Sequence, residues 1–163
     1  MDESKRVSYN NERLLLIDKS VRPKIAAVIK DMEGHGLRPL IAKEVWRNPK
    51  EQMALYKAGS SKVSWGFHCA CTKDGKPGSL ASDIIDADLA WNAPRKFWMM
   101  LGSSAIAHGL GWGGMWGLPK SLKSGLLKAI ECKDWDCAVK FGWDVAHIET
   151  ANVSIEDAKA GKR

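Results

Sequence analysis

The chain has 163 residues, of which 45% are hydrophobic and 27% charged, a composition typical of one globular domain that buries its own core. It contains no apolar run near the roughly 18 residues of a membrane span, and its first apolar run, residues 14–17, is too short for a secretory signal. The formal charge of +6 favours anionic partners without choosing among nucleic acid, wall polymer and membrane surface. We therefore expect one domain over residues 1–163, made in the cytoplasm without a signal peptide, with flexibility only at residues 1–10 and 152–163.

The first third of the chain predicts helix, strand and helix. Apolar residues recur at helical spacing over residues 12–32, where Pro23 can divide the pattern into two helices. Residues 37–46 are rich in branched side chains and predict a partly buried strand. Asn48 can cap a third helix, which begins at the proline that follows it and ends at Gly59.

The remainder predicts a central helix between short strands. A strand is expected at residues 80–85, and Pro94 begins a long helix that ends near His108. The glycine-rich stretch after that helix is unsuited to helix, and residues 141–149 predict a final strand. Long helices with a few short strands indicate an α+β domain in which helices pack on a small antiparallel sheet.

The four cysteines form two close pairs, Cys69 with Cys71 and Cys132 with Cys137. In a reducing compartment the default interpretation is four free thiols, whereas an oxidising envelope would permit a disulfide between the pairs. A four-thiolate zinc site is a further alternative, but neither pair has the spacing usual for structural zinc.

The histidines raise the question of a catalytic metal. Such a zinc site needs about three imidazole or carboxylate ligands, a position open to water, and a nearby carboxylate to handle protons. His68, Asp83 and His147 can supply the ligands and Asp144 the proton acceptor, with Glu149 as an alternative acceptor. Taken alone, this combination is weak evidence, because any chain of this size offers several pairs of histidine and aspartate.

The order of motifs along residues 40–149 is more specific. It resembles the zinc peptidase family that includes D-alanyl-D-alanine carboxypeptidases, vancomycin-resistance dipeptidases and phage L-alanyl-D-glutamate endolysins. The elements that carry the resemblance are, in chain order, Trp46 and Arg47, Glu51 and Gln52 with Leu55, Tyr56 and Gly59, then His68, then Ser79, Ala81 and Asp83, and finally Trp143 and Asp144 with His147. A Gly-Trp-Gly-Gly-x-Trp run at residues 111–116 also looks like a segment of the phage members.

The resemblance implies roles for five residues. His68, Asp83 and His147 would bind one zinc ion per chain, Asp144 would act as general base and then acid, and Arg47 would face the substrate and stabilise its oxyanion. Arginine suits that role because its charge persists at any working pH. Judged without the resemblance, Arg47 is an ordinary surface residue in front of a helix cap.

The function that the resemblance implies is that of a phage-type endolysin. It would be a monomeric peptidase that hydrolyses the stem peptide of peptidoglycan, at the L-alanyl-D-glutamate bond, and acts on the cell wall after release from the cytoplasm. Its partner would be the anionic bacterial envelope and not nucleic acid. Two alternatives stay open: a D-alanyl-D-alanine carboxypeptidase or cross-link endopeptidase of the same family, and a non-enzymatic basic module whose cysteines hold a structural metal.

The chain departs from the family pattern at two places. Gly66 replaces a serine that usually stands two residues before the first histidine, so we expect Ser64 to supply a hydroxyl at the substrate site. The gap between His68 and Asp83 is longer than in short members of the family, by an insert at residues 69–78. We expect this insert at the mouth of the site, where it could shape substrate choice.

Strand geometry adds one further prediction. Residues three apart on a regular strand face opposite sides, so Asp144 and His147 can share a site only if the backbone is irregular at residues 144–146. Among the tryptophans, Trp112, Trp116 and Trp143 could line the cleft, and we assign Trp112 and Trp143 to substrate binding. Core packing is the commoner role for a tryptophan at any of the three positions.

Overall fold

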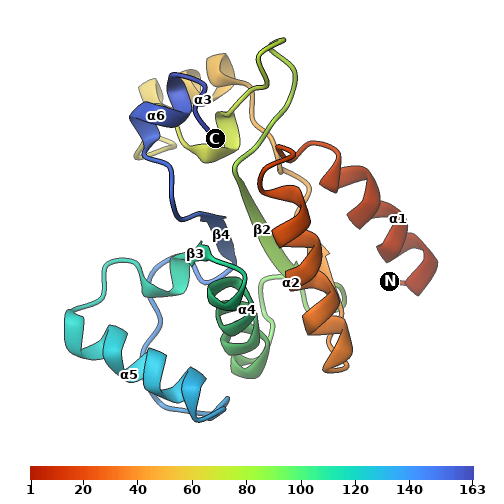
Figure 1. Ribbon diagram of the computed structural model, residues 1–163, viewed down its shortest axis with the longest axis vertical. Coiled ribbons are helices and arrows are strands. Elements are labelled where there is room, and N and C mark those ends of the chain that lie inside the picture. Colours follow the sequence, from red (N-terminus) through yellow and green to blue (C-terminus); the bar gives the residue numbers. More distant parts are fainter.

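Four short strands form one antiparallel sheet in the computed structural model, which describes residues 1–163 (Figure 1). They are β1 (Pro39–Ile41), β2 (Ala81–Asp86), β3 (Leu110–Trp112) and β4 (His147–Thr150), and their order across the sheet is β1-β2-β4-β3. The last strand of the chain therefore lies between the second and the third. This order brings the end of the sequence beside its middle.

Six α-helices surround the sheet, and none is long and apolar enough to cross a membrane. They are α1 (Glu3–Leu14), α2 (Arg22–Gly34), α3 (Pro49–Lys57), α4 (Arg95–Ala107), α5 (Lys120–Glu131) and α6 (Ile155–Lys159). In Figure 1, α2 and α4 lie side by side across one face of the sheet, and α3 and α6 both lie beyond its upper end in this view. The chain is a single compact α+β domain, as the sequence predicts.

The two faces of the sheet have different chemistry because side chains alternate along each strand. Ile84 of β2 and Ile148 of β4 are fully buried in the core with α2 and α4. Asp83 and His147 have the opposite parity and are direct partners in the β2–β4 register. Directly opposed residues of an antiparallel pair project to the same face, so both point away from the two core helices.

Helix α1 covers the edge strand β1, although its residues are mostly polar. Arg6 is 2% exposed and donates from Nη1 to the Pro39 carbonyl at 2.8 Å, and Asn10 donates to the same carbonyl at 3.0 Å. The Asn10 side-chain oxygen accepts from the Ile41 backbone N–H at 2.8 Å. The helix thus satisfies strand groups that an edge leaves unpaired.

Both chain ends, where we expected flexibility, form helices in this structure. The buried side chains of α1 explain its order at the N-terminal end. At the other end, Ser154 caps α6 by accepting from the Asp157 backbone N–H at 3.1 Å. Arg163 then contacts Asp18 near the start of the chain, with 3.1 Å between Nε and Oδ2.

Other expected elements are present with different bounds. The expected helix at residues 12–32 is two helices, α1 and α2, separated by a turn, and α1 begins nine residues earlier than expected. The expected strands at 37–46 and 141–149 are shortened to β1 and β4, because the chain leaves the sheet after Ile41 and joins it only at His147. Asn48 caps α3 as predicted, and α4 ends at His108 as predicted.

Candidate metal centre

Three side chains from distant parts of the sequence converge at one point. His68 lies in the short 3-10 helix η1 (Phe67–Cys69), and Asp83 and His147 face each other on β2 and β4. His147 Nδ1 lies 2.9 Å from Asp83 Oδ1 and 3.3 Å from His68 Nε2, and His68 Nε2 lies 3.6 Å from Asp83 Oδ1. Ligands about 2.1 Å from a tetrahedral ion are about 3.4 Å apart. The three atoms have this spacing, and they could hold a metal ion.

The insert at residues 69–78 does not keep His68 from Asp83, because it folds back as a hairpin. Cys71 and Pro77 pair across it, and the Leu80 backbone N–H donates to the Phe67 carbonyl at 3.0 Å. The chain thus returns to η1 immediately before β2 begins. The extra length is absorbed within the hairpin and does not change the position of Asp83 beside His68.

Backbone contacts orient the ring of His68. Its Nδ1 lies 2.8 Å from the Val45 carbonyl, which can only accept, so Nδ1 carries the proton and donates. In the neutral ring, Nε2 then has a free lone pair directed at Asp83 and His147. The Arg47 backbone N–H donates to the His68 carbonyl at 3.0 Å, so the segment before α3 holds both the ring and the backbone of this residue.

The ring of His147 lies between two carboxylates. Nε2 donates to Glu149 Oε2 at 3.0 Å, and Nδ1 faces Asp83 Oδ1. Burial would lower the pKa of His147, but the hydrogen bonds to Asp83 and Glu149 outweigh it and raise the pKa to about 9. Without a metal ion, the protonated ring is therefore favoured, with one ring N–H facing each carboxylate.

Asp83 completes an acceptor cluster. Burial would raise its pKa, but hydrogen bonds from His147 and His68, and the charge of those rings, lower it well below the usual range. With both rings neutral, the two ring nitrogens and the Asp83 oxygen are three acceptors with no donor between them. Such a cluster requires a proton or a metal ion, and its donor set of two imidazoles and one carboxylate fits zinc.

Asp144 lies beside this cluster on an irregular segment, as strand geometry predicts. Residues 145–146 form a turn in which the His147 backbone N–H donates to the Asp144 carbonyl at 3.2 Å. Burial raises the pKa of Asp144, His147 opposes this rise, and the charge of Asp83 adds to it. A half-buried carboxylate with a raised pKa is suited to accept and return a proton.

The glycine-rich stretch before α5 supports this turn. A Cβ atom at Gly113 would lie 2.3 Å from the Asp144 carbonyl oxygen, so only glycine permits this approach. Trp112, which we assigned to substrate binding, is 3% exposed and donates from Nε1 to the Val145 carbonyl at 2.8 Å. Its ring packs against Gly102 and Gly114. In this structure Trp112 is a core residue that holds the turn, and it offers no surface to a ligand.

An aromatic row extends from the cluster to the surface. The ring of Trp116 packs 4.8 Å from that of His147, and the Trp143 ring packs 5.0 Å from Trp116, measured between centroids. Trp143 is 73% exposed, so its ring is free to contact a ligand. Ser64 is half-buried on a bend before η1, and no contact joins it to the cluster.

The Arg47 guanidinium is held by its own segment. Nη1 donates to Gln52 Oε1 and Nη2 to Glu44 Oε2, both at 2.7 Å. Its side chain is 31% exposed, and its backbone is bonded to His68. The structure therefore places Arg47 next to η1 in a fixed orientation, without direct contact with Asp83 or His147.

The four cysteines do not form a metal site. All are free thiols, Cys69 and Cys137 buried and Cys132 exposed, and the group that could hold a metal contains no cysteine. The alternative of a cysteine-held structural metal therefore has no cluster in this structure.

Three groups contact the centre in ways that the sequence does not predict. The role of the Val45 carbonyl cannot be predicted from the sequence, because every residue type has the same backbone carbonyl oxygen. Glu149 was considered only as a base, although its place two residues after His147 on a strand puts it on the same face. Trp116 was left out of the proposed substrate-binding residues, although it belongs to the same glycine-rich run as Trp112.

Comparison with known proteins supports the fold. No protein-family model and no curated protein sequence matches the chain. Among solved structures, the chain is similar to the L-Ala D-Glu endopeptidase ChiX of Serratia marcescens, with a TM-score of 0.53 and 14% sequence identity over 88% of this chain and 86% of that chain. The alignment covers most of both chains, so the likeness concerns the whole domain. At this identity it shows that the chain has the fold of that protein.

Proposed function

We propose that this protein is a zinc-dependent peptidase that hydrolyses the L-alanyl-D-glutamate bond of the peptidoglycan stem peptide. The observation that carries the proposal is the acceptor cluster of His68, Asp83 and His147, with Asp144 beside it. The substrate is suggested by the motif order along the chain and by the printed name of the structural neighbour, an L-Ala D-Glu endopeptidase.

In the proposed reaction, three residues would hold the metal ion and a fourth would transfer protons. A zinc ion bound by His68, Asp83 and His147 would polarise the scissile carbonyl and lower the pKa of a water molecule. Asp144 accepts a proton from the attacking water and returns it to the leaving amine. Its raised pKa favours the first transfer, because a carboxylate with a pKa nearer neutrality is a stronger base.

Two further groups surround the reacting bond in this proposal. Arg47, held by Glu44 and Gln52, supplies a permanent positive charge toward the oxyanion that forms on the substrate. The exposed ring of Trp143, packed at a tilt against Trp116, forms a wall against which the stem peptide or its attached sugar packs.

The biological role that we propose is that of an endolysin. The protein would be made in the host cytoplasm, act as a monomer, and reach the cell wall after release. The net charge of +6 would attract it to the anionic envelope.

The test measures metal and cleavage together. We expect the purified protein to contain about one zinc per chain, as three protein ligands and an open position imply. It should release fragments from purified peptidoglycan whose masses identify the L-alanyl-D-glutamate bond as the bond cut. His68→Ala should lose both the zinc and the cleavage.

A matched histidine variant serves as the control. His35 is exposed and lies outside the cluster, so His35→Ala should keep zinc and activity. Full cleavage by metal-free His68→Ala protein would refute the zinc mechanism. Fragments cut at a D-alanine bond would keep the mechanism but refute the proposed substrate bond.

A further inference from the structure

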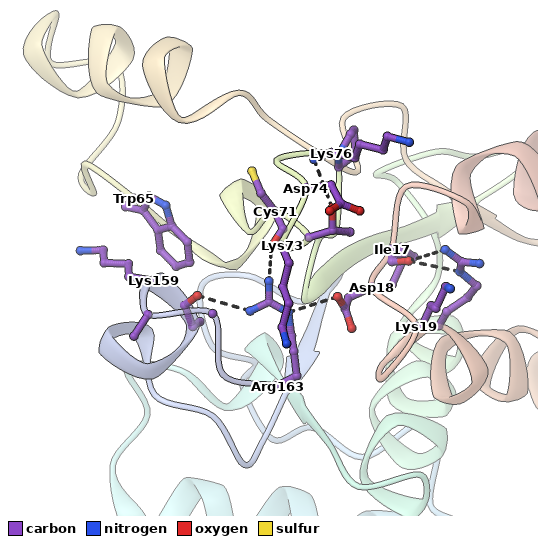
Figure 2. Close-up of a pocket in the computed structure, with 16 residues that line it drawn as sticks. Ile17, Asp18, Lys19, Trp65, Cys71, Lys73, Asp74, Lys76, Lys159 and Arg163 are labelled. Atoms are coloured by element: carbon purple, nitrogen blue, oxygen red, sulfur yellow. Dashed lines mark hydrogen bonds and ion pairs between the residues drawn. The ribbon is translucent and has the colours of Figure 1, made fainter.

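A large cavity lies away from the acceptor cluster of His68, Asp83 and His147. It has a volume of about 970 Å³, and neither the three cluster residues nor Asp144 line it. Figure 2 shows its walls: the segment after α1 with Ile17 and Asp18, the hairpin of the insert with Lys73 and Lys76, and the C-terminal segment with Lys159 and Arg163. We call this space the hairpin recess.

The walls of the hairpin recess are fixed by hydrogen bonds. The Arg163 guanidinium, in the middle of Figure 2, contacts Asp18, the Cys71 carbonyl and the Ala158 carbonyl, and thereby joins all three walls. The hairpin is closed by the Thr72 backbone N–H, which donates to the Lys76 carbonyl at 2.9 Å. The recess is therefore a built part of the fold.

The charge of the hairpin recess is strongly positive. Six basic residues line it against two acidic ones, Asp18 and Asp74. The two arginines are used internally, since Arg22 donates to the Ile17 carbonyl at 2.8 Å and Arg163 pairs with Asp18. The four lysines form no ion pair in the structure; they are Lys19, Lys73, Lys76 and Lys159. Four cations without an ion pair thus surround a space large enough for an extended ligand.

One aromatic side chain shares the hairpin recess with these lysines. Trp65 is half-buried, and its ring packs edge-on against Phe67 with 6.5 Å between centroids. The Lys159 ammonium lies 5.6 Å from the centroid of the Trp65 ring. An apolar ring face next to ammonium groups suits a ligand that has both an apolar ring face and negative charge.

We propose that the hairpin recess binds an anionic sugar polymer, a chain of sugar rings that carry phosphate or carboxylate groups. The lysines neutralise successive charges, and the face of one sugar ring packs on Trp65. Lysine is a point charge on a flexible stem, so it tolerates the variable spacing of charges along a polymer. This binding site is separate from the metal cluster, and its existence does not depend on the proposed peptidase activity.

The same features argue against single-stranded nucleic acid as the ligand. Proteins that bind such strands stack successive bases on several aromatic side chains. The hairpin recess has Trp65 alone, since no other aromatic residue lines it. Its arginines, the residues that stack on bases and form paired bonds to phosphate, are already engaged.

The test compares binding to defined polymers by calorimetry, with no hydrolysis required. The probes are a glycosylated poly(ribitol phosphate), polygalacturonate, neutral dextran, inorganic polyphosphate and a single-stranded DNA oligomer. We expect the unaltered chain to bind at least one of the two charged sugar polymers more tightly than DNA and to leave dextran unbound. The tighter of the two identifies phosphate or carboxylate as the preferred group.

Two sets of variants locate the binding site. Lys73→Glu with Lys159→Glu should weaken binding of the charged sugar polymer at least about tenfold, because two attractions become repulsions. Lys123→Glu with Lys128→Glu, exposed on α5, changes the net charge equally and should leave the affinity nearly unchanged. Trp65→Leu should weaken binding of the sugar polymer but not of inorganic polyphosphate.

Three results would overturn the inference: equal losses in both pairs of lysine variants, DNA binding at least as tight as that of the tighter-binding sugar polymer, or full affinity in Trp65→Leu. Thermal unfolding of each variant distinguishes a lost site from a lost fold. Zinc content and peptide cleavage of the unaltered chain are measured separately, on a small soluble stem peptide, so a failure here is distinguishable from a failure of the proposed peptidase.

Discussion

The two nitrogens of the His147 ring face different carboxylates, and this difference determines where a metal can bind. Glu149 accepts the proton of Nε2 at 3.0 Å, so the lone pair of the neutral ring is on Nδ1, toward Asp83 and His68. Histidine ligands in metal sites commonly donate their second ring N–H to a carboxylate in this way. From its position on β4, Glu149 thus contacts His147 on the side of the ring away from Asp83.

We predict that Glu149→Ala weakens zinc binding about 10- to 100-fold, because the His147 ring loses the acceptor that fixes its tautomer and orientation. Glu149→Gln should recover most of this affinity, since its amide oxygen can accept from the same Nε2–H. Competition with a zinc chelator measures the change. Glu131→Ala, at an exposed site on α5, is the matched control, and unaltered zinc affinity in Glu149→Ala would exclude this positioning role.

Asp144 should be separable from the metal ligands by one substitution. Asp144→Asn keeps the size of the side chain but cannot take a proton, so we expect zinc content to remain while cleavage falls by about 10²- to 10⁴-fold. Metal analysis and steady-state cleavage of a stem peptide measure the two effects. Asp136→Asn, an exposed aspartate elsewhere, should change neither. If Asp144→Asn cleaves at the normal rate, Asp144 is not the base and another group must accept the proton.

At the scale of elements, the packing of α1 on β1 is a feature that hydrophobic patterns in the sequence do not predict. The helix has a polar sequence, yet Asn10 is 4% exposed and bonds both a carbonyl and an N–H of the edge strand. Its contribution comes from satisfying backbone groups and not from apolar burial. Hydrophobic periodicity does not predict such a helix, because its buried residues are polar.

Asn10→Ala tests this contact. Removal of the side chain leaves the buried Ile41 N–H without a partner, which should lower the free energy of unfolding by about 1–3 kcal/mol. Urea unfolding measures the loss. Asn11→Ala, exposed on the same helix, should change stability by less than about 0.5 kcal/mol. Equal stability of the two variants would mean that α1 does not protect the edge of the sheet.

At the scale of the whole molecule, Asp18 links the two ends of the chain. It accepts from Ser20 and pairs with Arg163, which also contacts the hairpin. Burial would raise the pKa of Asp18, but the bonds from Ser20 and the Arg163 charge lower it below the usual value. The folded state therefore favours the ionised carboxylate.

The sign of the resulting pH dependence follows from this lowered pKa. The contribution of Asp18 to stability is fully present above its unfolded pKa of about 3.9 and is lost as the pH falls through the lower pKa of the folded state. We predict that Asp18→Asn is less stable than the unaltered chain at neutral pH and that the difference shrinks in acid. Urea unfolding of both proteins over a pH series measures it, and a constant difference would show that Asp18 contributes through packing alone.

Helix starts in this chain are set by local residues, whereas strand ends are set by distant pairing partners. Helices α3 and α4 were predicted closely because Asn48 and Pro94 are local start signals, whose effect depends on a few neighbouring residues. The strands at β1 and β4 are shorter than predicted. The β-propensity of a residue does not indicate where a strand loses its pairing partner. The position of Trp112 could not be predicted from the sequence either, because an indole can line a cleft or fill the core. In the structure its ring packs closely on Gly102 and Gly114, which places it in the core.

The sequence by itself determined the chemistry that this protein can have. The resemblance in motif order pointed to His68, Asp83 and His147. Strand parity then required a bend at residues 144–146 if Asp144 and His147 share a site. The tertiary structure decided what these residues do together. The pairing of β2 with β4 brings Asp83 opposite His147, the hairpin returns the chain to His68, and Glu149 selects the free nitrogen of His147. These are contacts between residues far apart in the chain, and they depend on strand register and loop closure, which no local pattern of side chains specifies.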